Sequence, residues 1–186
     1  MSSTTAGAAG TQAPATLDGF EVLDAFHRET IARLDELTAL VAGLDGTAAP
    51  STVAREAAAA IVAFFSTASR QHHEDEEQHV FPALLAGATE EVLQAVQRLR
   101  QDHGWLQEDW HELQPQIDAL ASGQSWVDID TLREGTQIFI ALSRDHIALE
   151  ESIIYPQARA RLGEQARREM GREMAARRRG QRSKGS

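Results

Sequence analysis

Cysteine is absent from this 186-residue chain. Its absence excludes a disulfide framework, a thiol nucleophile, thiolate-bound zinc and cysteine-ligated iron–sulfur clusters. Aromatic residues make up only 5% of the chain, whereas alanine and leucine are common, which favours helix over sheet. Long apolar runs are also missing, so no membrane span is expected. Residues 1–17 lack an apolar core and early basic residues, and we predict a disordered leader rather than a signal peptide. We therefore expect a soluble, cytoplasmic protein.

Positive charge is scarce in most of the chain. The formal net charge is −10, yet ten of the eighteen Lys and Arg residues lie from Arg159 onward. The C-terminal segment is therefore near +7, and the remainder is near −17. An acidic body disfavours general binding of nucleic acid and suits a protein that attracts cations. The basic segment is predicted to be a solvated end, with a nucleic-acid or acidic-lipid contact there as the alternative.

The hydrophobic pattern predicts four long helices. Apolar residues recur at intervals of three and four from Asp18 to Gly43, from Pro50 to Leu84, from Val92 to Leu120 and from Thr131 to Gln157. Thr131 and Glu134 are spaced as a capping box for the fourth helix. Short loops between long helices imply an all-α, up-down-up-down four-helix bundle. We assign residues 18–161 to this bundle and residues 162–186 to an additional basic helix or tail, and the sequence leaves open whether this helix docks on the bundle or stays loose.

Each predicted helix carries one histidine within its apolar stripe, and two of these histidines are followed four residues later by a glutamate. The four are His27, His73, His103 and His146, and the glutamates are Glu77 and Glu150. Residues four apart in a helix project from one face, about one turn apart. Imidazole and carboxylate on the inner faces of a bundle are the ligands of a two-metal iron or manganese site.

The positions of the loops test this interpretation. In an antiparallel helical hairpin, residues equidistant from the turn lie at the same height. The midpoints between successive histidines fall at Pro50, at Ala88 and between Gln124 and Ser125, all in predicted loops. We therefore expect the four histidines to share one layer of the bundle. A purely structural polar layer is the alternative, but burying several ionisable groups is costly unless they are paired or bind metal.

Other polar residues near these histidines are given ordinary surface roles. Asp75 and Glu76 are expected on the solvated face of the second helix, and His72 and His79 at its surface. His111 is expected to lie beside the apolar stripe of the third helix. Apolar walls around the metal layer are predicted from five residues: Phe65, Leu106, Trp110, Phe139 and Ile153.

The ordered motifs resemble the hemerythrin-like family of HHE cation-binding domains. The resemblance covers about residues 18–161 and rests on Asp24–His27, His72–Pro82, Gln101–His103 and His146–Pro156. It implies a four-helix bundle with an oxo- or hydroxo-bridged pair of iron ions, with manganese as an alternative. Carried over by position, the family's imidazole ligands correspond to His27, His73, His103 and His146, and its bridging carboxylates to Glu77 and Glu150.

Two positions depart from the oxygen-carrying hemerythrins. Gln107 stands where they have a second histidine on the third helix. Glu74 resembles the additional carboxylate in the iron-sensing domain of an F-box protein, which adds it to the expected ligands. The resemblance thus implies a protein that binds or senses O2, iron or redox state. The alternatives are a diiron enzyme with ferroxidase, peroxide or nitric-oxide chemistry, and a helical adaptor acting through its basic tail. O2 or another small diatomic or peroxide is the expected partner.

Overall fold

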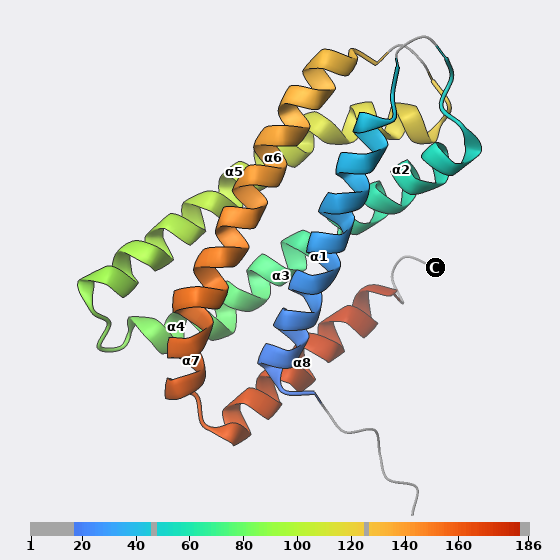
Figure 1. Cartoon of the computed structure of the whole chain (residues 1–186). Helices are drawn as coiled ribbons and strands as arrows, with labels where there is room; N and C mark the ends of the chain where they lie inside the picture. Colours follow the sequence, from blue (N-terminus) through green and yellow to red (C-terminus); the bar gives the residue numbers. More distant parts are fainter. Residues whose placement is uncertain (1–16, 46–47, 125–126, 183–186) are drawn as a thin grey trace, which may run out of the picture.

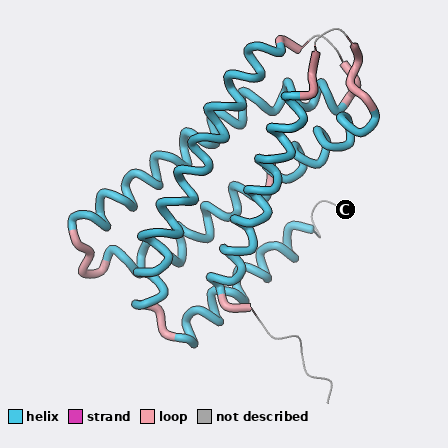
Figure 2. The backbone as a smooth tube through the Cα atoms, in the orientation of Figure 1, coloured by secondary structure: helices cyan, strands magenta, loops and turns pink. Residues whose placement is uncertain are grey.

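The structure is a computed structural model that describes residues 17–45, 48–124 and 127–182, and its regular structure within those residues is entirely helical. Figures 1 and 2 show an elongated bundle of antiparallel helices. Eight α-helices and two π-helical segments follow in chain order: α1 (Gly19–Ala42), α2 (Thr52–Phe65), α3 (Ala68–Asp75), η1 (Glu76–Val80), α4 (Phe81–Leu85), α5 (Glu90–Ala121), α6 (Ile129–Leu149), η2 (Glu150–Ile154), α7 (Tyr155–Arg161) and α8 (Glu164–Arg182).

Four arms make up the bundle, as the sequence predicted. The first arm is α1 and the third is α5, while the second and fourth are each divided: α2, α3, η1 and α4 form the second, and α6, η2 and α7 the fourth. The expected second helix is thus interrupted at Ser66 and Thr67. The connections around Pro50 and Ala88 are loops, and Gln124 follows the end of α5. Ser125 and the expected leader, except Leu17, lie outside the described residues.

Side-chain caps fix the helix ends. Asp18 accepts a hydrogen bond from the Phe20 amide and forms a capping box with Glu21, which starts α1 where the sequence predicted. The expected capping box at Thr131 is wrong. Asp128 caps α6, because its carboxylate accepts the amide N–H groups of Asp130 and Thr131. These donors favour the ionised carboxylate and lower the pKa of Asp128.

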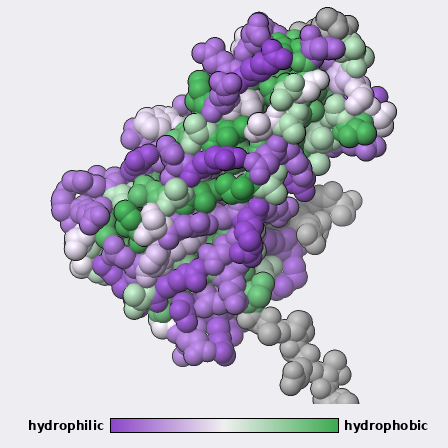
Figure 3. Space-filling model, viewed as in Figure 1, coloured by the Kyte–Doolittle hydropathy of each residue, from purple (hydrophilic) through white to green (hydrophobic). Residues whose placement is uncertain are grey.

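The apolar core is divided into two clusters. One lies around α4, α7 and α8 and contains Leu23 and Leu99, and the other lies toward the α1–α2 loop and contains Leu34 and Leu106. Between these leucines, α1 carries His27 and α5 carries His103, both buried. A polar layer therefore separates the two clusters across the middle of the bundle. Figure 3 shows that the outer surface is mostly hydrophilic on the viewed face, with smaller hydrophobic patches.

The two π-helical segments share a local sequence pattern. Each begins with a pair of glutamates, Glu76–Glu77 in η1 and Glu150–Glu151 in η2, and each is followed by an aromatic residue and proline. A proline ring in an α-helix clashes with the carbonyl four residues earlier, which here belongs to the π-helical segment itself. Widening the helix to π relieves that clash. Single π turns inside helices are frequent at functional sites.

The basic C-terminal segment packs against the bundle. Helix α8 lies beside α1 (Figure 1), and Met170 and Met174 are buried in the apolar cluster. Arg167 pairs with Asp18 at 3.0 Å, and Arg177 bonds Asp75 and Gln78. Part of the positive charge of this segment is therefore paired with acidic residues of the bundle. Among the described residues, no helix is both long and apolar enough to span a bilayer.

Candidate metal centre

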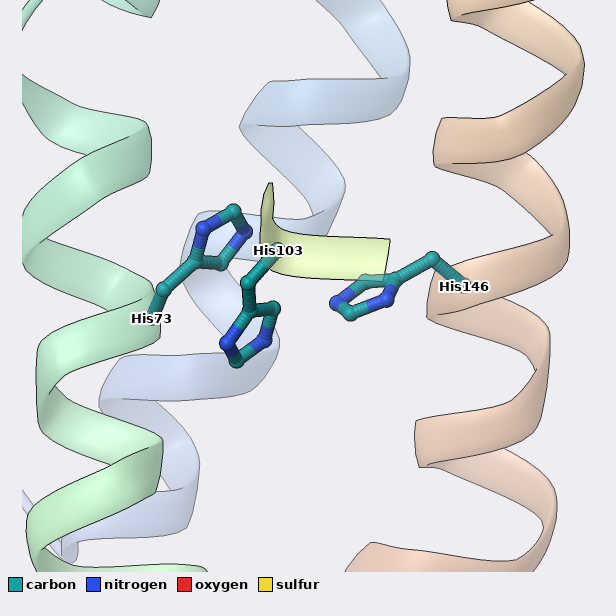
Figure 4. Close-up of side chains that lie close together, drawn as sticks. All are labelled: His73, His103 and His146. Atoms are coloured by element: carbon teal, nitrogen blue, oxygen red, sulfur yellow. The ribbon is translucent and has the colours of Figure 1, made fainter. Parts of the chain in front are cut away.

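Histidines from four helices converge on the polar layer. Figure 4 shows His73 of α3, His103 of α5 and His146 of α6 pointing toward one another. The rings of His73 and His103 stack with centroids 3.9 Å apart, and those of His103 and His146 are 5.0 Å apart. These three residues can offer nitrogen atoms that all lie within 4.8 Å of one another. They form one half of the candidate site.

The other half is formed by four fully buried residues: His27, His72, Glu76 and Glu150. The Nε2 atoms of His27 and His72 are 3.1 Å apart. Tyr155 lies against this half, where its hydroxyl donates a hydrogen bond of 2.5 Å to Glu76 and its ring stacks on that of His27. Two imidazoles and two carboxylates thus face one small space.

Both carboxylates reach across the two halves. The Oε2 atom of Glu150 lies 3.1 Å from His27 Nε2, and its Oε1 lies 3.0 Å from His146 Nε2. Glu76 repeats this pattern, with Oε1 3.5 Å from His72 Nε2 and Oε2 3.5 Å from His103 Nε2. Each carboxylate therefore presents one oxygen to each half, which is the arrangement required of a group that bridges two metal ions.

Unpaired buried atoms support a fit to metal. Both oxygens of Glu150, Oε2 of Glu76, and the Nε2 atoms of His103 and His146 are buried without a hydrogen-bond partner. Such groups are costly to bury unless something satisfies them. A cation in each half would meet these atoms, since the first half offers three nitrogens and two oxygens and the second two nitrogens and two oxygens. This donor set contains no sulfur and suits iron or manganese.

The pKa values reflect the crowding of ionisable groups. Burial, and then the nearby Glu150, raises the pKa of Glu76 to about 7. Burial would lower the pKa of His146, but the charge of Glu150, interactions with Asp102 and the charge of Glu76 together outweigh burial and raise that pKa to about 10. Burial and neighbouring histidines hold the pKa values of His72 and His73 well below 6.5, so both rings are neutral, the form that binds metal.

Two residues that the sequence nominated lie outside these groups. The side chain of Glu74 is 44% exposed and pairs with Arg70 at 3.0 Å. The side chain of Glu77 is 45% exposed, and its Oε1 accepts a hydrogen bond of 2.8 Å from Nδ1 of His103. Glu77 therefore contacts a histidine of the layer from behind, on the ring atom that faces away from the carboxylate of Glu76.

His72 and Glu76 belong to the layer, although the sequence analysis placed both at the surface. That expectation of exposure is wrong, as is the one for Asp75: His72 is 2% exposed, Glu76 is 0% exposed and Asp75 is 3% exposed. On a helical wheel, successive residues advance by about 100°, so Glu76 falls at about 40° from His72, between it and His73. The inward face is therefore centred between the two histidines, and Glu77 lies on its flank.

The sequence pattern that ends both the second and the fourth arm indicates His72 and Glu76. Glu76 and Glu150 each lie six residues before a proline, Pro82 and Pro156. Aligned on those prolines, His72 corresponds to His146, four residues before its glutamate. His73 and Glu77 have the same spacing of four as His72 and Glu76, so that spacing alone does not distinguish the two pairs.

A cleft connects the three-histidine half to solvent between α2, α3 and α5. Its volume is about 490 Å³, and its lining includes His73, His103, Gln107 and His111. Four of the five predicted wall residues, Phe65, Leu106, Trp110 and Phe139, line it as well. The fifth, Ile153, packs instead against the apolar cluster around α4 and α7. The other half of the site is closed, because its four residues are fully buried.

Comparison with known families bears on this geometry. The model of the hemerythrin HHE cation-binding domain matches residues 18–158. The chain belongs to this family. The match covers all four arms of the bundle and both halves of the polar layer. No curated protein matches the chain. Membership of this family, together with the buried His and Glu cluster, supports a bound metal ion.

Proposed function

We propose that this HHE domain binds two iron ions and uses them to bind or sense O2 or a related small oxidant. The observation that carries the proposal is the pair of carboxylates, Glu76 and Glu150, each with one oxygen in each half of the layer. His27 and His72 complete one half, and His73, His103 and His146 the other. A pair of ferrous ions, when bound, would supply two electrons to a small oxidant.

Iron or manganese suits this donor set better than zinc. The three-histidine half offers five protein donors when both carboxylates are counted, whereas zinc sites are usually four-coordinate and tetrahedral. The carboxylate oxygens are hard donors that favour ferric over ferrous iron. Manganese accepts the same nitrogen and oxygen ligands and is the alternative metal.

The protein supplies position, access and exclusion of water. The Tyr155 hydroxyl donates a hydrogen bond to Glu76, and this bond fixes the orientation of the carboxylate on the closed side. On the open side, the cleft has aromatic and aliphatic walls, and its lining also includes Gly104 and Gln107. A β-carbon at Gly104 would meet no atom within 4 Å, so the cleft remains wide at this point.

A second candidate function is a diiron enzyme that consumes peroxide. The cleft favours it, because its lining carries polar groups such as Arg100 and Gln107, and its volume far exceeds that of a diatomic ligand. A polar substrate from solvent could therefore reach the three-histidine half. Ferroxidase and nitric-oxide chemistry at the same site remain within this second candidate.

Reaction of the iron-loaded protein with oxidants tests these proposals. The ferrous protein should change its absorption spectrum on exposure to O2 or to one equivalent of peroxide. A binder or sensor would stop after one reaction, whereas an enzyme would consume many equivalents of peroxide. Replacement Gly104→Leu should slow either reaction without loss of iron, because the side chain would narrow the cleft. A ferrous protein that reacts with none of the oxidants would overturn both functions.

A further inference from the structure

Three of the five histidines in the polar layer have a carboxylate behind the ring. Nδ1 of His27 lies 3.1 Å from Oε1 of Glu151, and Nδ1 of His103 lies 2.8 Å from Oε1 of Glu77. Nδ1 of His146 lies 3.7 Å from Oδ2 of Asp102, a looser electrostatic contact. We call Glu77, Glu151 and Asp102 the supporting carboxylates.

Every supporting carboxylate acts between helices. Glu151 of η2 reaches His27 on α1, Glu77 of η1 reaches His103 on α5, and Asp102 of α5 reaches His146 on α6. Each also adjoins a residue of the layer in sequence, since Glu77 follows Glu76, Glu151 follows Glu150 and Asp102 precedes His103. The helix that carries each supporting carboxylate thus also contributes a residue to the layer, while the carboxylate contacts a histidine of another helix.

The remaining two histidines are held differently. The ring of His72 stacks on Phe26 with centroids 4.1 Å apart, and its Nδ1 is buried without a hydrogen-bond partner. The ring of His73 stacks on that of His103. Packing rather than a carboxylate sets the orientation of these two rings. The layer therefore contains two classes of histidine: those with a carboxylate behind the ring and those held by packing.

We propose that the supporting carboxylates are positioning residues for the two metal ions, an inference that rests on the proposed function. Glu151 and Glu77 each hold a proton on Nδ1 of their histidine, which leaves the lone pair of Nε2 directed into the layer. Asp102 acts on His146 through its charge at 3.7 Å. Carboxylates in this position fix the tautomer and ring orientation of a metal-bound histidine and make it a stronger donor. In each glutamate pair of the π-helical segments, the first residue would hold the metal ions and the second positions a histidine.

Glu77→Gln and Glu151→Gln test this role, and Glu74→Gln is a matched control. Glu74 and Glu77 lie three residues apart and are 44% and 45% exposed, but only Glu77 contacts a histidine of the layer. Competition with a ferrous chelator measures the affinity of each variant. We expect affinity to fall by about 10–100-fold for Glu77→Gln and Glu151→Gln, and to stay at the wild-type value for Glu74→Gln. Glu77→Ala should lose more than Glu77→Gln, since the amide still offers an oxygen acceptor.

Two further measurements separate positioning from a general structural role. The melting temperature of the metal-free variants should match that of the wild type, because Glu77 and Glu151 are half exposed. The reduction potential of the iron-loaded variants should rise, because a weaker imidazole donor stabilises ferric iron less. Equal loss of stability with and without metal would overturn the positioning role.

The outcomes also distinguish this inference from the proposed function. Wild-type protein that takes up iron, with affinities that do not change in Glu77→Gln and Glu151→Gln, would overturn the inference alone. A Glu74→Gln protein as weak as Glu77→Gln would also overturn it, because surface charge would then explain the effect. Wild-type protein that takes up no iron would overturn the proposed function and the inference together.

Discussion

At the scale of single residues, the difference between Glu76 and Glu77 decides the chemistry of the layer. Glu76 is fully buried with oxygens toward both halves, whereas Glu77 is half exposed behind His103. With saturating ferrous iron, Glu76→Gln should therefore bind less than two ions per chain. Glu77→Gln should still reach two, although with lower affinity. Metal analysis after gel filtration checks this, and equal stoichiometry for the two variants would contradict it.

Glu76→Gln should stabilise the metal-free protein. Burial and Glu150 raise the pKa of Glu76 from 4.5 to about 7, so the folded state holds this proton more tightly than the unfolded state. Stability is therefore lost as the pH rises from about 4.5 through 7. At pH 8, metal-free Glu76→Gln should melt a few degrees higher than the wild type, since 1 kcal/mol shifts Tm by roughly 2–4 °C at this chain length. At pH 4.5, the difference should disappear.

The sequence located residues of the layer most directly where one helix carries one candidate, while their role as metal ligands stays a prediction. His27, His103 and His146 each stand alone on an inward face, and the structure places all three in the layer, together with His73 and Glu150. The second arm offers His72, His73 and four consecutive acids, and a helical wheel alone does not centre its face. Packing against the other arms decides which residues of the second arm face inward, and these include His72 and Glu76.

At the scale of elements, the two π-helical segments place the glutamates. Pro82 and Pro156 each follow a π-helical segment by two residues, and their rings disfavour an α-helical carbonyl four residues earlier. Replacing both prolines by alanine should let the segments tighten toward α-helix and rotate Glu76 and Glu150 away from the layer. We expect iron affinity to fall by roughly 10-fold, in line with other changes around metal ligands.

Circular dichroism provides the control for the proline variant. Helix content should remain unchanged, because alanine is the best helix former and restores a backbone donor. A loss of helix would indicate misfolding rather than rotation. Unchanged iron affinity in a fully helical variant would show that the prolines do not maintain the π turns. The sequence did not predict the π turns, because the hydrogen-bond spacing within a helix depends on how the arms of the bundle pack together.

At the scale of the whole molecule, α8 contributes to stability. Met174 is fully buried in the cluster around α4 and α7, a docking that the sequence left open. Met174→Ala should cost about 2–5 kcal/mol and lower the melting temperature. Arg172, on the exposed side of α8, gives the control: Arg172→Ala should change it little. Similar melting temperatures for both variants would show that α8 does not support the bundle.

The fold was predictable because its signals are redundant. Apolar periodicity, caps and loop positions all indicated the same four arms, and the family match covers residues 18–158. The docking of α8 was less evident, because few apolar residues mark its inner face and Arg167 and Arg177 attach it through charges elsewhere in the chain. Charge complementarity between distant segments becomes visible only in three dimensions.

The number of ferrous ions bound per chain tests the central claim most directly. Metal-free protein would be titrated with ferrous iron under anaerobic conditions, separated from unbound metal and analysed for iron and protein. Two halves that share Glu76 and Glu150 predict a plateau at two ions per chain, and metal loading should raise the melting temperature because binding stabilises the folded state. A plateau at one ion, or no uptake of iron, would contradict the account.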